Sequence, residues 1–208
     1  MFQFAEITLT TWAILVGLII LGVVLFIMTH HRQKWTTRMM ANASLCIALA
    51  FILSYVKLYE MPQGGSVTLA SMIPIIMFAY AYGIAPGLMI GFAYGLLQFV
   101  QGGWFVHPIQ FLLDYPLAFA MLGFAGIARR LPDRWGMIPG ILLGVLLRFL
   151  CAFLTGVFFW GDGAGEQNVL VYSAVYNGTY LIPETAICIA IAMIPQIRTL
   201  ARQLTLTK

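Results

Sequence analysis

Seven stretches of the chain are apolar over most or all of the length that a lipid bilayer requires. A membrane helix needs roughly 20 mostly apolar residues. The chain is 62% hydrophobic and only 9% charged, whereas a soluble domain carries about a quarter charged residues. These charges are too few to cover a surface in water, so the sequence predicts an all-α integral membrane protein. The predicted segments are Thr8–Met28, Arg38–Val56, Val67–Tyr82, Pro86–Val100, Gln110–Ala128, Met137–Phe159 and Val169–Ile194.

The basic residues predict how the chain is oriented. Nine of the eleven Lys and Arg residues form three clusters, which seven spans would place on one side of the membrane. Loops rich in Lys and Arg stay in the cytoplasm, so we expect a multi-pass cell-membrane protein with its N-terminus outside and its C-terminus in the cytoplasm. The net charge of +4 therefore reflects topology and lipid contact, and no nucleic-acid partner is expected. The clusters are Arg32, Lys34 and Arg38; Arg129, Arg130 and Arg134; and Arg198, Arg202 and Lys208.

The first span differs from the others, because its centre is a run of Leu, Ile, Val and Gly without polar residues. We expect residues 1–36 to form an additional N-terminal transmembrane anchor and a basic cytoplasmic turn. Residues 37–198 are then a six-helix membrane domain, and residues 199–208 are a cytoplasmic tail.

The predicted outer loops have a different chemistry from the basic side. Lys57–Ser66, Gln101–Ile109 and Trp160–Asn168 are rich in Gly, Gln, aromatic and acidic residues. The sequence contains no phosphate-binding loop, no HExxH or CxxC spacing and no Gly-x-Ser-x-Gly turn. We therefore predict a binding site on the outer side, and neither an enzyme nor a protein that uses a metal, a cofactor or ATP by itself.

Asp114 is the most informative residue of this outer side. It lies about one turn inside the fifth span and is followed by Tyr115. A carboxylate in hydrocarbon costs several kcal/mol unless a cation or hydrogen-bond donors meet it. Asp114 either pairs with Arg148 or caps a helix, or it meets a cationic or amine-bearing ligand; its neighbours favour the ligand.

The seventh span carries a second polar stripe. Tyr172, Tyr176 and Tyr180 share one helical face, Asn177 lies beside it, and Glu184 extends it by one turn. Tyrosines alone are typical of the interfacial aromatic belt. The amide and the carboxylate beside them favour a face that lines a cavity.

Two further features each allow a structural and a functional interpretation. Trp104 and Trp160 in the outer loops are either interfacial anchors or walls of an aromatic cage, which holds cations by about 0.5–2 kcal/mol per contact. On the second span, Ser44 and Ala48 form a small-xxx-small pair. Such a pair either packs within the bundle or admits a helix of a partner membrane protein.

Three blocks of the sequence resemble the ThiT family, the thiamine-specific S-components of energy-coupling-factor (ECF) vitamin importers. They are MPQGGSVTLASMIP, YGLLQFVQGGWFVHPIQFLLDYPLAF and YSAVYNGTYLIPE, within roughly residues 40–195. The resemblance implies a six-helix S-component bundle, here preceded by the additional helix Thr8–Met28. It also implies an outward-facing vitamin pocket with Leu58–Ser66 as its lid.

The resemblance further implies roles for individual residues. Asp114 and Tyr115 match the carboxylate–Tyr pair of the family, and Trp160 matches a Trp that stacks on the ligand. Tyr172 and Asn177 match ligand contacts of the last helix, and Gly156 matches a family glycine. Trp104 and Glu184 join the candidate site from the residue patterns described above.

Two departures concern the thiazolium half of the site. Ala152 stands where family members often carry a His four residues before the glycine that matches Gly156. A lid Trp found near the position of Gln63 in some members is absent. These differences affect the details of the site and leave the family assignment unchanged.

The resemblance implies that the protein captures thiamine outside and docks on a transmembrane coupling protein driven by two ATP-binding subunits. The docking face in the family matches Ser44 and Ala48, and the resemblance implies that the bundle tips over in the membrane to release its cargo. Alternatives are a self-sufficient, proton-coupled thiamine transporter, an S-component for another vitamin, and a membrane enzyme or assembly factor.

Overall fold

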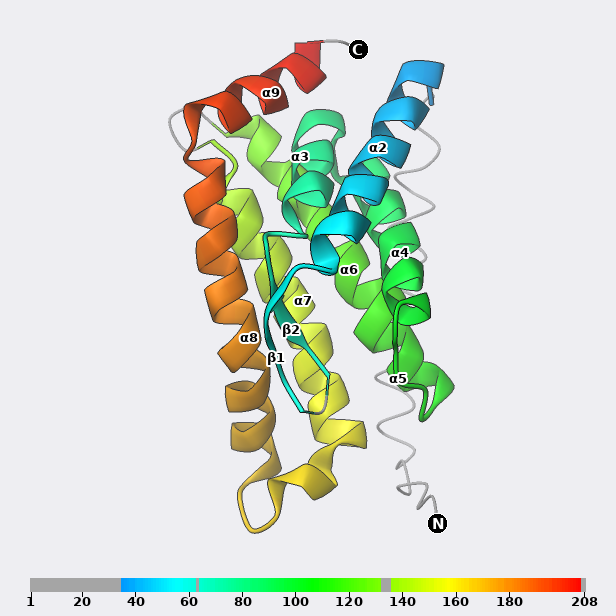
Figure 1. The fold of residues 1–208 in the computed structure, drawn as a ribbon, viewed down its shortest axis with the longest axis vertical. Helices are drawn as coiled ribbons and strands as arrows, with labels where there is room; N and C mark the ends of the chain where they lie inside the picture. Colours follow the sequence, from blue (N-terminus) through cyan, green and yellow to red (C-terminus); the bar gives the residue numbers. More distant parts are fainter. Residues whose placement is uncertain (1–34, 63, 132–135, 207–208) are drawn as a thin grey trace.

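The computed structural model describes residues 35–62, 64–131 and 136–206, and within them six helical segments form a bundle (Figure 1). The expected anchor Thr8–Met28 lies outside the described residues. The six segments correspond to the six predicted core spans. They are α2 (Thr37–Ser54), α3 (Ile73–Tyr82), α4 (Ile84–Val100), the continuous stretch Pro108–Arg130, α7 (Ile138–Phe159) and α8 (Val169–Ala192).

Three of these helices in the described part of the chain are long and apolar enough to cross a bilayer: α2, Pro108–Arg130 and α7. A fourth is counted if α8 and the start of α9 (Pro195–Leu206), which are bent by 83°, form one broken span. The predicted third span is shorter than expected. Residues 67 and 68 belong to a strand, so α3 has only 10 residues, all of them buried. It is a core helix enclosed by the others, about 15 Å long.

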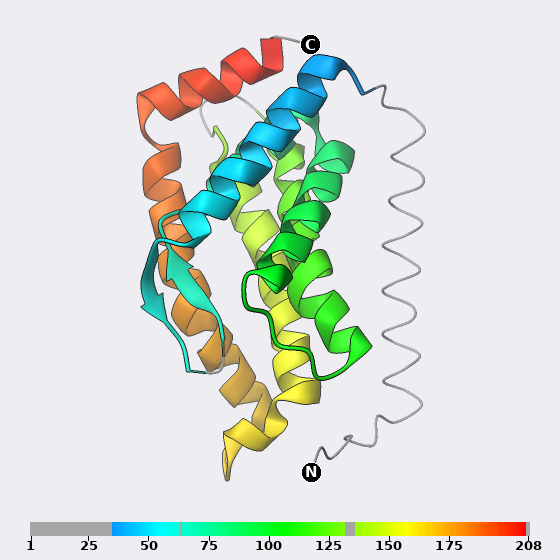
Figure 2. The same ribbon diagram turned by 45° about the vertical axis from the view of Figure 1, so that its right-hand side comes forward.

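The segment between α2 and α3 folds as a β-hairpin, which helical periodicity does not predict. Strands β1 (Lys57–Glu60) and β2 (Ser66–Thr68) pair antiparallel, and the connection uses Gly64 and Gly65 at positive φ. The resemblance described above implies a lid loop at Leu58–Ser66, and this hairpin occupies that position. Figure 2 shows the hairpin lying along one side of the bundle next to α8.

The stretch Pro108–Arg130 is helical throughout but changes its winding. It begins as α5 (Pro108–Leu112), where His107 Nδ1 accepts a hydrogen bond from the N–H of Ile109 and Pro108 takes the first helical position. It continues through the π-helix η1 (Leu113–Leu117), α6 (Ala118–Ala120) and the 3-10 helix η2 (Met121–Arg130). Pro116 has no N–H and its ring would collide with the carbonyl of an α-helical turn. The wider π turn relieves this conflict, and it contains Asp114 and Tyr115.

Close helix contact holds the stretch Pro108–Arg130 against α4. Gly87, Gly91 and Gly95 recur every four residues on α4 and face the backbone of residues 115–123. A Cβ at Gly91 would lie 2.9 Å from Ala120 Cα and would collide with the carbonyl oxygen of Phe119. Such small-residue faces let two membrane helices approach until their backbones touch.

Helix α9 packs across the end of the bundle at which α2 begins (Figure 1). Its Ala201 is 1% exposed and its Ile197 and Leu204 pack on the core. The helix starts at Pro195, so the predicted tail boundary at residue 198 falls inside a packed element. Arg38 and Arg198, from two of the predicted basic clusters, belong to the elements at this end.

The glycine face of α4 yields a stability prediction. Gly91→Ala should lower the free energy of unfolding by about 1–3 kcal/mol, the usual cost of overpacking. Thermal unfolding in detergent, followed by fluorescence-detected size-exclusion chromatography, measures it.

Gly178→Ala on α8 is the matched control. The added Cβ there would lie 3.5 Å from Ile182 Cδ1, an ordinary contact, and Ala favours the helix by about 1 kcal/mol. Equal losses in the two variants would contradict the close packing of α4.

Candidate functional site: a polar and aromatic pocket

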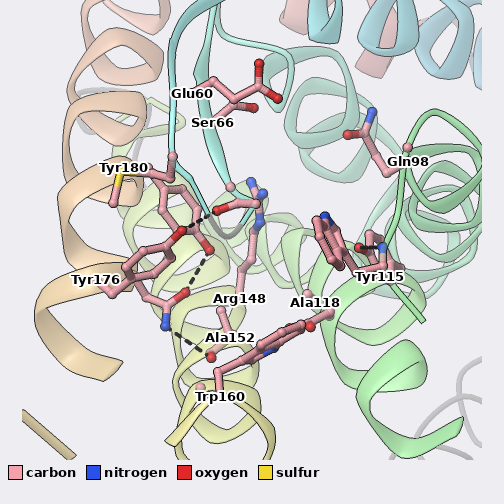
Figure 3. A pocket seen from close by; sticks show the side chains of 18 of the residues that line it. Glu60, Ser66, Gln98, Tyr115, Ala118, Arg148, Ala152, Trp160, Tyr176 and Tyr180 are labelled. Carbon is pink, nitrogen blue, oxygen red and sulfur yellow. Dashed lines mark hydrogen bonds between the residues drawn. The ribbon is translucent and has the colours of Figure 1, made fainter. Parts of the chain in front are cut away.

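A cavity of about 570 Å³ opens between the hairpin, α4, the π segment, α7 and α8. Figure 3 shows this cavity from close by, and its lining residues on α7 and α8 belong to the parts of these helices that lie away from α9 in Figure 1. Seven of the eight residues predicted for substrate binding line it, although they come from four different parts of the chain. They are Trp104, Asp114, Tyr115, Gly156, Trp160, Tyr172 and Asn177.

Asp114 lies in the π-helical turn and is held by a neighbour on the same stretch. Gln110 Nε2 donates a hydrogen bond of 2.8 Å to Asp114 Oδ2. The side chains of Thr155 and Trp160 also approach the carboxylate. The structural alternative, a pair between Asp114 and Arg148, is not formed. Arg148 instead pairs with Glu184.

Gln110 is a residue that the sequence patterns did not single out. It is fully buried, and its amide makes three connections. Its oxygen accepts from the N–H of Val106 at 3.1 Å, and its nitrogen donates to the carbonyl of Trp104 at 3.2 Å as well as to Asp114. The available signal was an uncharged amide one turn before a carboxylate in an apolar segment.

The aromatic wall of the pocket is built from two sides. The ring centroids of Trp104 and Trp160 are 6.3 Å apart at an interplanar angle of 87°. Tyr115 positions the loop that carries Trp104, because its hydroxyl accepts from the backbone N–H of Trp104 at 2.7 Å. Figure 3 shows Trp160 and Tyr115 on different walls of the same cavity.

On the opposite wall, the predicted tyrosine stripe of α8 faces the cavity and the hairpin. The Tyr176 hydroxyl donates to the carbonyl of Gly64 at 2.9 Å. The Tyr180 ring packs so closely on Gly65 that a Cβ there would lie 2.7 Å from it. The tip of the hairpin is thus fixed to α8 at the edge of the pocket. Tyr172 continues the wall, with its ring centroid 6.0 Å from that of Tyr176.

Asn177 is buried between α7 and α8, and its hydrogen bonds limit what it can offer. Its Nδ2 donates to the carbonyls of Ala152 (3.2 Å) and Ser173 (2.9 Å), and its Oδ1 accepts from the Tyr180 hydroxyl at 2.9 Å. Both N–H groups are used, so Asn177 can present only its oxygen to a ligand. Gly156 permits this arrangement, because a side chain there would collide with Ser173.

Glu184 is predicted as a ligand contact, but the structure places it away from the cavity wall. It continues the stripe of α8, but it is 1% exposed and lies outside the cavity lining. The residue that reaches the cavity at this level is its partner Arg148. Ala152, which stands in place of the family His, also lines the cavity.

The two residues predicted for partner docking lie elsewhere. Ser44 and Ala48 are exposed on α2, on a face with exposed Leu45 and Leu49. Only 22% of the apolar helix Thr37–Ser54 is buried inside the bundle. The small residues therefore do not pack within the described bundle. No group of three or more His, Cys, Asp or Glu side chains suited to a metal ion occurs in the described ranges.

This architecture defines a multi-pass membrane protein that encloses a polar and aromatic small-molecule pocket. The model of the thiamine transporter protein family (Thia_YuaJ) matches residues 40–203. The chain is 34% identical over 173 residues to the thiamine transporter ThiT of Bacillus subtilis, covering 76% of this chain and 89% of that protein. With ThiT of Lacticaseibacillus paracasei it shares 29% over 153 residues, covering 66% and 75% respectively.

The chain belongs to the thiamine transporter protein family. A solved structure of ThiT from Listeria monocytogenes has the same fold, with a TM-score of 0.68 and 23% identity over 80% of this chain and 96% of that one. The family resemblance and the six-helix S-component bundle predicted from the sequence are thereby confirmed. The relatives are transporter proteins and not enzymes, in agreement with the prediction.

The role of Gln110 can be tested without a ligand. Gln110→Met should cost about 1–3 kcal/mol of stability, because it leaves Asp114 and the backbone groups of Val106 and Trp104 without their partner. Amide hydrogen exchange should rise in residues 101–107 and stay unchanged in α9.

Gln98→Met is the control, because Gln98 donates to Gln101 at the partly exposed end of α4. A Gln110 variant with the exchange pattern of the Gln98 variant would show that Gln110 does not hold this loop.

Proposed function

We propose that this chain is the high-affinity thiamine-binding subunit of an ATP-driven ECF-type importer. The observation that carries the proposal is the Asp114 carboxylate inside an aromatic pocket, in a chain that belongs to the thiamine transporter family. Thiamine combines a cationic thiazolium ring with an aminopyrimidine. The first needs π faces and a negative charge, and the second needs hydrogen-bond acceptors.

Each group of the pocket has a matching role in this proposal. Asp114 and the oxygen of Asn177 accept hydrogen bonds from the ligand, and Tyr115 lies beside Asp114. Trp160 and Trp104 offer aromatic faces to the rings, and Tyr172 supplies another wall. Gly156 keeps the space between α7 and α8 narrow. The hairpin tip, attached through Tyr176 and Tyr180, covers the site.

Thiamine should quench the intrinsic tryptophan fluorescence of the purified chain, because Trp104 and Trp160 line the pocket. Riboflavin, biotin and pyridoxine, corrected for their own absorbance, should leave the binding signal unchanged. The absence of a thiamine response would refute the specificity. A response to another vitamin alone would identify an S-component for that compound.

Asp114→Asn should weaken thiamine binding about 10- to 150-fold, since hydrogen bonds to charged groups contribute about 1.5–3 kcal/mol. Glu60→Gln is a control, because Glu60 lines the cavity at its exposed rim, where water and salt screen its charge. An unchanged affinity in Asp114→Asn would remove this residue from the site.

The coupling partner is proposed from the exposed small residues of α2. Ser44 and Ala48 would admit helices of the transmembrane coupling protein, which works with two ATP-binding subunits. Ala48→Trp should abolish ATP-dependent thiamine uptake by the reconstituted complex while thiamine binding persists. Val175→Trp on the exposed side of α8 is a bulk-matched control that should retain uptake.

Uptake measured in proteoliposomes also distinguishes this proposal from self-sufficient transport. The purified chain without its partners should bind thiamine but accumulate none under a pH gradient. Accumulation by the chain alone would favour the proton-coupled alternative. The proposed orientation places the pocket outside and the C-terminus in the cytoplasm.

A further inference from the structure

Glu184 lies on α8 just outside the cavity lining. Its carboxylate connects α8 to strand β2, to the segment before α3 and to α7. Its Oε1 accepts hydrogen bonds from Thr68 Oγ1 at 2.5 Å and from Ser71 Oγ at 3.4 Å. Its Oε2 is the buried side-chain polar atom that has no hydrogen bond within the described part of the chain. That oxygen faces Arg148 Nη1 at 3.5 Å. Glu184 therefore acts on Arg148 and does not reach the cavity.

Arg148, by contrast, forms part of the cavity wall. Its guanidinium carbon lies 4.2 Å from the centroid of the Phe119 ring, and its side chain is 12% exposed. Figure 3 shows Arg148 extending from α7 between the tyrosine wall of α8 and the wall that carries Tyr115. A guanidinium keeps its proton in proteins, so a full positive charge borders a pocket proposed to hold a cation.

The other charges of the wall show why such a pocket is still suited to a cation. At the rim, Lys57 and Glu60 neutralise each other across 2.6 Å. The charge of Arg148 is neutralised by Glu184, which lies outside the cavity lining. Asp114 is bonded to the uncharged amide of Gln110 and forms no ion pair among the described residues. The pocket and its immediate support therefore carry one uncompensated negative charge. Without the carboxylate of Glu184 they would carry none.

We infer that Glu184 sets the charge selectivity of the pocket as a positioning residue and counter-ion that does not touch the ligand. Because Glu184 neutralises the charge of Arg148, the negative charge of Asp114 remains available to a monocation. This inference rests on the proposed function and adds to it the reason why a pocket containing an arginine accepts a positively charged ring.

The test compares thiamine with deazathiamine, in which an uncharged thiophene replaces the thiazolium. In Glu184→Gln the charge of Arg148 is no longer balanced. The Kd of thiamine should then rise at least about tenfold, equivalent to about 1.4 kcal/mol, while the Kd of deazathiamine changes less than about threefold. Calorimetric titration of the purified full chain gives both constants.

Two variants separate charge from structure. Thr68→Val removes a hydrogen bond to the same carboxylate without changing any charge, so it should alter both Kd values by the same factor. Arg148→Gln combined with Glu184→Gln removes both charges and should return the ratio of the two Kd values to that of the wild type. If Glu184→Gln alone does not fold, Arg148→Gln alone is the converse test, because it leaves the carboxylate of Glu184 unbalanced and should lower the Kd of thiamine relative to that of deazathiamine.

The outcomes distinguish this inference from the proposed function. An equal loss for both ligands in Glu184→Gln, or a double variant whose ratio departs from that of the wild type, overturns the inference and leaves the proposed function intact. A wild-type protein that binds neither ligand overturns both.

Discussion

The ion pair between Arg148 and Glu184 is the interaction on which the arrangement of the pocket depends. In a membrane bundle neither charge can be left alone, and breaking a buried pair costs about 3–5 kcal/mol. The pair connects α7 to α8, and Thr68 and Ser71 extend it to the end of the hairpin and the approach to α3. The floor of the cavity, its tyrosine wall and its hairpin cover therefore share one buried polar centre.

A second polar centre lies on the other side of the cavity. Gln110 joins Asp114 to the loop of Trp104, and Tyr115 holds the same loop by its hydroxyl. Both centres depend on unusual backbone. In the first, Ala70 has a positive φ between Thr68 and Ser71, and the second needs the π turn at Pro116. The two negative charges thus differ in environment: Glu184 is committed to a cation, whereas Asp114 is bonded to a neutral amide.

Hydropathy was sufficient to predict the six core helices, because burial of the backbone in lipid leaves few alternatives to a helix. It also identified Asp114 as a candidate, because an isolated carboxylate in an apolar segment is costly unless a cation or hydrogen-bond donors meet it. Period 3.6 placed Tyr172, Tyr176 and Tyr180 on one face correctly. Glu184 follows the same periodicity one turn further along α8 but does not line the cavity. Helical periodicity defines a face of a helix and does not indicate where along that face a cavity ends.

Other features could not be predicted because they depend on contacts distant in sequence. The hairpin strands have four and three residues, too few for alternation to be recognised. The importance of Gln110 comes from the loop of Trp104, which folds back onto it, and the sequence around Gln110 does not show this contact. The partner of Arg148 was uncertain, since both carboxylates lie in apolar segments and only the packing of α7 on α8 selects Glu184.

The most direct test of this account is an experimental structure of the chain with thiamine bound. The ligand should lie in the cavity between the hairpin, the π segment, α7 and α8. Its aminopyrimidine should contact Asp114 and Asn177, and an aromatic ring of Trp160 should lie against it. Glu184 should remain paired with Arg148 and make no contact with the ligand. Thiamine bound outside this cavity, or seated in it without contact to Asp114, would contradict the account.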